Sequence, residues 1–256
     1  MIRRDYNGGW ILITQYHHAI LAGQIMSYWG NETFLKPDPY EEVLFAIREH
    51  DAGWEDWDSN PKINSENGYP ANFTEMSPYD QSVIWSNCYR SNAKNHSYAS
   101  ALIALHFSKF NRSNLKEDPD NDHLKLLLLD MREVISQELG FKISDSNSDK
   151  IPEQVRVNLK LLQIGDIISL TLCHGWRSIE ITETPISYEG DETTLKMESG
   201  DGLNYILSPY PFNTPSLNVR IEGRILNKKS FTDDDDLRTF IKNSESVSLD
   251  FTIRKG

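Results

Sequence analysis

Residues 48–54 read REHDAGW and place a histidine and an aspartate side by side, His50 and Asp51, at the end of a segment with apolar residues every three or four positions. This periodicity predicts a helix over residues 39–51. Adjacent residues on a helix point about 100° apart, so both side chains can contact one ion only if it lies between their directions. The doublet alone is weak evidence, and its meaning depends on the residues that accompany it.

Other periodic segments predict helices on both sides of the doublet. They cover residues 15–29, a segment beginning near residue 97, residues 124–139 and residues 153–173. Polar breaks are predicted at residues 113–122 and 144–150, and a short strand at residues 10–14. Residues 52–89 are rich in aromatic residues, Pro and Gly, which predicts a long irregular excursion of a kind that is often functional.

The pattern changes from residue 177 onward. Short alternating segments such as 178–182 and 217–221 are bounded by Gly, Pro and Asp, which predicts an antiparallel sheet. The four acids at 233–236 predict a helix N-terminus or a solvated loop. We therefore expect a mainly α helical bundle with a C-terminal antiparallel β region, α+β overall. A helical metal-binding domain would cover residues 1–175, with a β-rich region at residues 176–256 packed on it.

Further histidines and an aspartate stand on other predicted helices, namely His18, His106 and Asp166. Imidazole and carboxylate donors suit divalent Zn, Mn, Fe, Ni or Co, and facing helices can direct them at one point. His96 stands between His50 and His106 in the chain. In the alternative interpretation, the histidines are hydrogen-bonded core residues and Asp166 pairs with a buried donor. A buried aspartate on an apolar helix is costly without a partner or a metal, which favours the metal site.

The order of these residues resembles the HD-domain superfamily of metal-dependent phosphohydrolases. The resemblance implies an HD-domain-like helical fold with a metal bound by His18, His50, Asp51 and Asp166. His96 and His106 stand where two-metal members of that superfamily place extra histidines, and His106 is the better candidate of the two.

A second resemblance covers nearly the whole chain. The pieces QYHHA at 15–19, HDAGW at 50–54, ALH at 104–106 and GDIISL at 165–170 resemble a family of uncharacterised bacterial proteins known as a domain of unknown function. That resemblance implies no particular activity.

The predicted chemistry is metal-assisted hydrolysis of a small phosphorylated or nucleotide-like substrate. Asp51 is the ligand expected to contact the nucleophilic water and accept its proton. Arg48, Arg90 and Arg177 are the basic residues near the motifs that could contact a phosphate. Two alternatives stay open, a di-iron oxygenase and a non-catalytic sensor that binds a metal or ligand.

The residues after the doublet depart from the HD pattern. Many HD phosphohydrolases carry Lys or His two residues after the Asp, whereas this chain has Gly53 followed by Trp54. Trp54 and Trp57 could stack on a substrate or pack in the core. The departure favours the alternatives to phosphate chemistry.

Composition limits the partners. The chain of 256 residues has 38 acidic and 26 basic side chains, a formal net charge of −12, which disfavours binding to nucleic acid or to an anionic membrane. No apolar run approaches the roughly 20 residues of a membrane span, and residues 1–9 do not resemble a signal peptide. We expect a cytoplasmic protein with a small-molecule substrate, and a homo-oligomer is compatible with the sequence.

Overall fold

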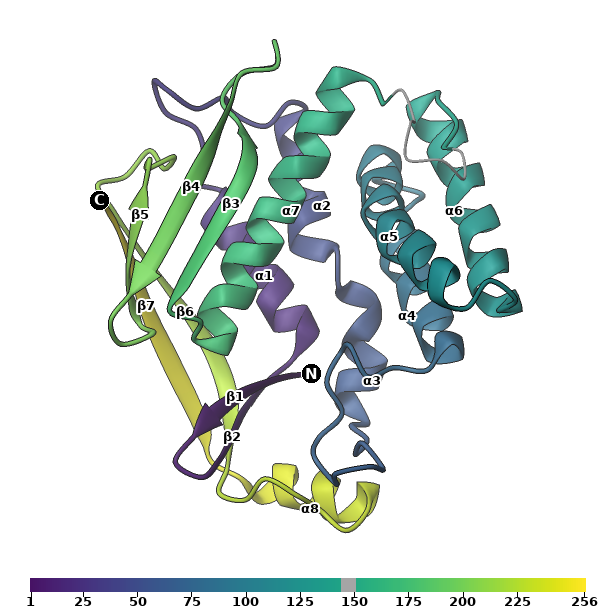
Figure 1. Ribbon diagram of the computed structural model, residues 1–256, viewed down its shortest axis with the longest axis vertical. Coiled ribbons are helices and arrows are strands. Elements are labelled where there is room, and N and C mark those ends of the chain that lie inside the picture. The colour runs from purple at the N-terminus through teal and green to yellow at the C-terminus, as the bar shows by residue number, and fades with distance from the viewer. Residues whose placement is uncertain (144–150) are drawn as a thin grey trace.

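The computed structural model describes residues 1–143 and 151–256 (Figure 1), and the break predicted at 144–150 lies outside them. The strands are β1 (Ile2–Tyr6), β2 (Gly9–Ile13), β3 (Ser178–Pro185), β4 (Glu192–Ser199), β5 (Asn204–Ser208), β6 (Ser216–Leu226) and β7 (Ser246–Lys255). The helices are α1 (Gln15–Met26), α2 (Tyr40–Glu49), the 3-10 turn η1 (Ala52–Trp54), α3 (Glu55–Ser59), α4 (Pro78–Arg90), α5 (Ser97–Glu117), α6 (Asp122–Leu139), α7 (Glu153–His174) and α8 (Asp234–Asn243).

All the strands join one sheet in the order β1-β2-β6-β7-β5-β4-β3. The β1–β2 hairpin enters it through β2, where Trp10 pairs with Leu226 of β6. Every neighbouring pair is antiparallel except β5 and β7, which are parallel. Strands from both sides of residue 175 therefore share one sheet.

The predicted fold class, a mainly α HD-domain-like bundle with a C-terminal antiparallel region, is wrong. The chain is α+β, built around a mixed seven-stranded sheet that includes its N-terminal hairpin. Asn7 and Gly8 both have positive φ and form the tight turn of that hairpin, a signal that the Asn-Gly dipeptide carries in the sequence. The parallel pairing arises from contacts distant in sequence, which periodicity cannot predict.

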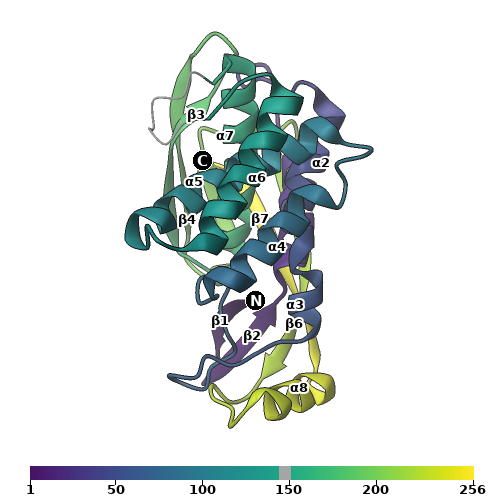
Figure 2. The same cartoon turned by 90° about the vertical axis from the view of Figure 1, so that its right-hand side faces the viewer.

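Helices α1 and α7 lie beside the sheet, and α2, α4, α5 and α6 lie beyond them (Figure 1). Viewed from the helical side, α4, α5 and α6 stand in front of the strands (Figure 2). The candidate residues are thus carried by the helices on one side of the sheet.

Among the described residues, no helix is long and apolar enough to cross a membrane.

The largest departures from the predicted helices are at α4 and α5. Helix α4 lies within the predicted excursion, where the Ser77 side chain accepts from Asp80 N and Pro78 occupies the first turn. Helix α5 continues to Glu117, through the start of the break predicted at 113–122. The Ser-Pro-x-x start signal in the sequence marks α4, whereas packing of α5 against α6 extends that helix beyond its apolar run.

Candidate metal centre

Five side chains from four parts of the helical layer meet at one buried place. His18 lies on α1, His50 caps the C-terminus of α2 and is followed by Asp51, His106 lies on α5, and Asp166 lies on α7. The three histidines and Asp51 are buried, and the Asp166 side chain keeps 17% of its surface exposed. We call these five residues the His–Asp cluster.

The tightest part of the cluster joins His18, His50 and Asp51. Nε2 of His18 lies 2.8 Å from Oδ2 of Asp51, and Nε2 of His50 lies 3.8 Å from the same oxygen. One donor atom from each of the three residues falls within 4.8 Å of the others. The two rings meet edge to face with centroids 5.1 Å apart.

Asp166 divides its oxygens between different histidines. Oδ1 lies 3.6 Å from Nε2 of His50 and 4.0 Å from Nε2 of His18, whereas Oδ2 lies 3.7 Å from Nε2 of His106. Donor atoms about 2.1 Å from a common ion are themselves about 3 to 4 Å apart. The distances from Asp166 to the three histidines match that spacing, whereas the 2.8 Å between His18 and Asp51 is the distance of a hydrogen bond.

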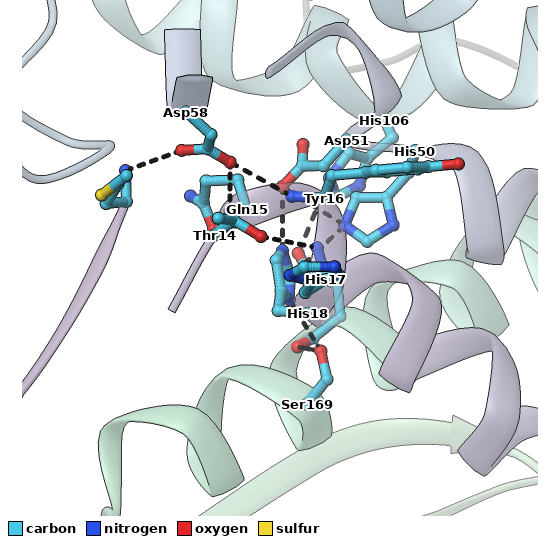
Figure 3. Close-up of polar contacts among 12 residues, drawn as sticks. Thr14, Gln15, Tyr16, His17, His18, His50, Asp51, Asp58, His106 and Ser169 are labelled. Carbon is cyan, nitrogen blue, oxygen red and sulfur yellow. Dashed lines mark hydrogen bonds and ion pairs between the residues drawn. The ribbon is translucent and has the colours of Figure 1, made fainter. Parts of the chain in front are cut away.

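Hydrogen bonds at the far side of two rings fix which nitrogen faces the cluster. Nδ1 of His50 lies 2.7 Å from the carbonyl oxygen of Ile47, which can only accept, so Nδ1 carries the hydrogen. Nδ1 of His18 lies 2.9 Å from Oγ of Ser169 (Figure 3). That hydroxyl donates to the carbonyl oxygen of Asp166. Ser169 is therefore free to accept from His18, and both rings direct Nε2 inward, as metal ligands require.

Nε2 of His50 is one of two buried ring nitrogens of the cluster, with Nδ1 of His106, that lack a hydrogen-bond partner among the described residues. Burying such a nitrogen without a partner is costly. An ion beside Nε2 of His50 would supply its missing partner.

The charges of the cluster oppose the cost of burial. Burial lowers the pKa of His50, but the neighbouring charges of Asp51 and Asp166 outweigh it and raise that pKa to about 9. Burial raises the pKa of Asp166, whereas the histidines lower it further, to about 2. Burial lowers the pKa of His106 to about 4, so this ring is neutral at pH 7. The carboxylate of Asp166 and the ring of His106 are thus in the ionisation states that bind cations.

A cavity of about 380 Å³ opens onto the cluster. Its walls are mainly apolar, and the apolar side chains that line it are Trp54, Phe73, Trp85, Phe107, Phe110, Ile167 and Leu170. Four uncharged polar side chains also line it, those of Gln15, Thr74, Gln81 and Asn114. The geometry thus combines a group of potential metal ligands with an apolar space for a small molecule.

Other predicted site residues lie elsewhere. His96 stacks on Phe45 with ring centroids 3.6 Å apart and hydrogen-bonds Glu42, and it does not line the cavity. Trp57 lies under the Lys62 ammonium group beside a separate open depression. Of the two predicted tryptophans, Trp54 alone lines the cavity beside the cluster.

The predicted phosphate-binding arginines also lie outside the cavity. The side chain of Arg48 is half exposed and donates to Glu49. The guanidinium of Arg90 forms an ion pair with Asp130, and Arg177 is exposed after the end of α7. None of these three residues contacts the cluster or lines its cavity.

Sequence reasoning missed two residues that support the site, Ser169 and Gln15. Ser169 follows Asp166 by one helical turn, and Gln15 precedes His18 by one turn. Residues three apart on a helix share a face, so this spacing was the available signal. The same rule identifies Phe110, which lies four residues after His106 and lines the cavity.

Comparison with known proteins gives a match to one family model. A family described as "Protein of unknown function (DUF3891)" matches residues 1–228, which include the whole His–Asp cluster and every residue of the cavity wall. No curated protein and no solved structure matches the chain. The match agrees with the resemblance to a domain of unknown function and does not extend to the HD-domain superfamily.

Proposed function

The chain belongs to the DUF3891 family of proteins of unknown function, and we propose that it is a metal-dependent hydrolase whose ion is held by the His–Asp cluster. One observation carries the proposal: the buried Nε2 of His50, which lacks a hydrogen-bond partner among residues 1–143 and 151–256, lies among two other imidazole nitrogens and two carboxylates. The ligand types follow the HD-type order, although the surrounding fold is a different one.

The donor set suits a borderline divalent ion, Zn, Mn, Fe, Ni or Co. Such an ion would lower the pKa of a water molecule and polarise the bond to be cleaved. The protein orients the rings of His50 and His18 before an ion binds, because Ile47 and Ser169 hydrogen-bond the nitrogens that face away from the cluster. The Nε2 atoms of both histidines thereby face the position that an ion would occupy.

Asp51 is the residue we assign to proton transfer. Its carboxylate is buried at the cluster end of the cavity, where it can accept a proton from the attacking water. The apolar wall beside it, including Trp54, excludes bulk water and strengthens the electrostatic interactions within.

A reporter ester tests the proposal. We expect zinc- or manganese-loaded protein to hydrolyse p-nitrophenyl acetate, EDTA treatment to abolish turnover and added metal to restore it. Asp51→Asn should lower turnover by about a hundredfold or more, whereas Asp56→Asn, an exposed change of the same kind on α3, should not. Equal turnover in wild type and Asp51→Asn would overturn the assignment, and a bound metal without turnover would favour the sensor alternative.

A di-iron oxygenase is the second candidate, and Asp166 provides the observation that favours it. Its two oxygens face different histidines, His50 and His106, as in a carboxylate that bridges two ions. Two irons per chain with oxygen-dependent turnover would support this function, whereas one ion with turnover under argon supports hydrolysis.

A further inference from the structure

The cavity has an unusual charge balance for a site that would bind phosphate esters. Among the described residues that line it, two are aspartates, three are histidines and none is Lys or Arg. Lys109 stands three positions after His106 on α5, but its side chain is exposed and is not part of the wall. A phosphate dianion would enter an apolar space that holds two carboxylates and no Lys or Arg, and the protonated ring of His50 is already offset by both carboxylates.

The wall is built to contact a flat apolar body. Trp85 and Phe107 stack with ring centroids 5.1 Å apart and planes inclined by 16°, and Phe110 leans against Trp85. Aromatic surfaces of this kind bind aromatic or aliphatic ligands through burial of apolar area and ring stacking. The size of the cavity, about 380 Å³, suits a small molecule.

Outside the His–Asp cluster, two polar atoms of wall residues remain without partners in the described part of the chain. Oε1 of Gln15, an acceptor, and Nε1 of Trp54, a donor, are both buried and make no hydrogen bond. The two residues are only 1% and 3% exposed, so bulk water does not satisfy these atoms. An uncharged ligand with one donor and one acceptor would pair with both once these two side chains turn toward the cavity.

From these observations we infer that the substrate is an uncharged amide with an aromatic or similarly apolar body, and not a phosphate ester. The inference rests on the proposed function and names its substrate class. In the reaction, the water oxygen bonds to the amide carbon and the C–N bond breaks. Asp51 takes one proton from the water and returns it to the leaving nitrogen, which gives a carboxylic acid and an amine. Gln15 and Trp54 would position the amide group, and the aromatic wall would hold its body.

Binding of two matched probes tests the inference without requiring turnover. Calorimetric titration of the EDTA-treated and the zinc-loaded protein would compare benzamide, which is neutral, with phenyl phosphate. We expect benzamide to bind at least tenfold more tightly to the metal-free protein and to remain the tighter ligand after zinc is added. Tighter binding of phenyl phosphate in both forms would overturn the inference.

Two pairs of variants test whether the two probes bind in this cavity. Gln81→Lys adds a cation to the wall and should strengthen phenyl phosphate binding severalfold, whereas Gln137→Lys, the same change on the exposed side of α6, should not. Gln15→Leu should weaken benzamide binding at least fivefold, whereas Gln24→Leu at an exposed position of α1 should leave it unchanged. Equal effects within either pair would contradict binding in this cavity.

Failure of the substrate inference and failure of the proposed function give different results. Zinc binding with a preference for phenyl phosphate leaves the metal site intact and removes the amide inference. Preference for benzamide in a protein that binds no metal leaves the ligand class and removes the hydrolase. Release of p-nitroaniline from p-nitroacetanilide, faster than release of p-nitrophenol from p-nitrophenyl phosphate, would support both.

Discussion

Nε2 of His18 lies 2.8 Å from Oδ2 of Asp51, although 33 positions separate the two residues and they belong to different helical segments. The opposite nitrogen of the same ring lies 2.9 Å from Oγ of Ser169 on α7. The ring is therefore fixed from both ends by two other segments. A ligand that is already oriented loses little conformational entropy when an ion binds.

Ser169→Ala should weaken metal binding by about ten- to a hundredfold, because residues that orient metal-bound histidines contribute to affinity on that scale. Titration of the EDTA-treated variant with zinc and a competing chelator would measure the change. Ser108→Ala is the matched control, since Ser108 is also buried in a helix but its hydroxyl donates to Leu105 of α5. The same loss of affinity in both variants would remove the orienting role of Ser169.

The buried histidines should give the metal-free protein a contribution to stability that is greatest near pH 6.5. Burial holds the pKa of His106 and of His174 at about 4, so between pH 4 and 6.5 the unfolded chain binds protons that the folded chain does not, and stability rises with pH. The pKa of His50 is about 9, because the charges of Asp51 and Asp166 outweigh its burial. Between pH 6.5 and 9 the folded chain keeps this proton, so stability falls as pH rises.

Urea unfolding in EDTA across pH 4.5 to 9 would measure this profile. His50→Gln, which cannot be protonated, should lack the decline above pH 6.5 while keeping the acid limb. Bound metal should also remove the alkaline decline, because it displaces the His50 proton. A flat profile in the metal-free wild type would contradict the charge balance of the cluster.

Gly53→Ala should destabilise the protein by about 1–3 kcal/mol, as overpacking of a tight contact does. A Cβ atom at this position would lie 2.3 Å from the carbonyl oxygen of Ile84 and 2.6 Å from the amide nitrogen of Cys88, both backbone atoms of α4. Gly200→Ala is the control, because nothing lies within 4 Å of its added Cβ. Urea unfolding at pH 7 would compare them, and an equal effect would mean that α4 can move away.

The sequence pattern identified the residues of the His–Asp cluster but not what surrounds them. Their placement on separate helices followed from apolar periodicity, which predicted α1, α2, α6 and α7 nearly to their ends. The position of His96 could not be predicted, because its order in the chain is compatible with the cluster while its place at the start of α5 turns it toward Glu42. Gly53 and Trp54 depart from the HD pattern. Gly53 allows α4 to approach closely, and Trp54 lines the cavity.

The sheet was harder to predict for a physical reason. Local alternation identifies strands such as β6, but pairing depends on contacts between distant segments. The union of β2 with β6 joins residues more than 200 positions apart, as Trp10 and Leu226 show. The sequence indicated that the aromatic stretch at 52–89 could be functional, but it could not show the cavity, because the residues of its wall come from the loop after α3 and from several helices.

Elemental analysis of the protein purified from cells grown in metal-replete medium tests the central claim most directly. We predict at least one divalent transition-metal ion per chain, lost in His50→Ala and in Asp51→Ala but retained in His123→Ala, a change at an exposed histidine of α6. A metal-free wild-type protein, or equal metal content in wild type and His50→Ala, would contradict the metal centre.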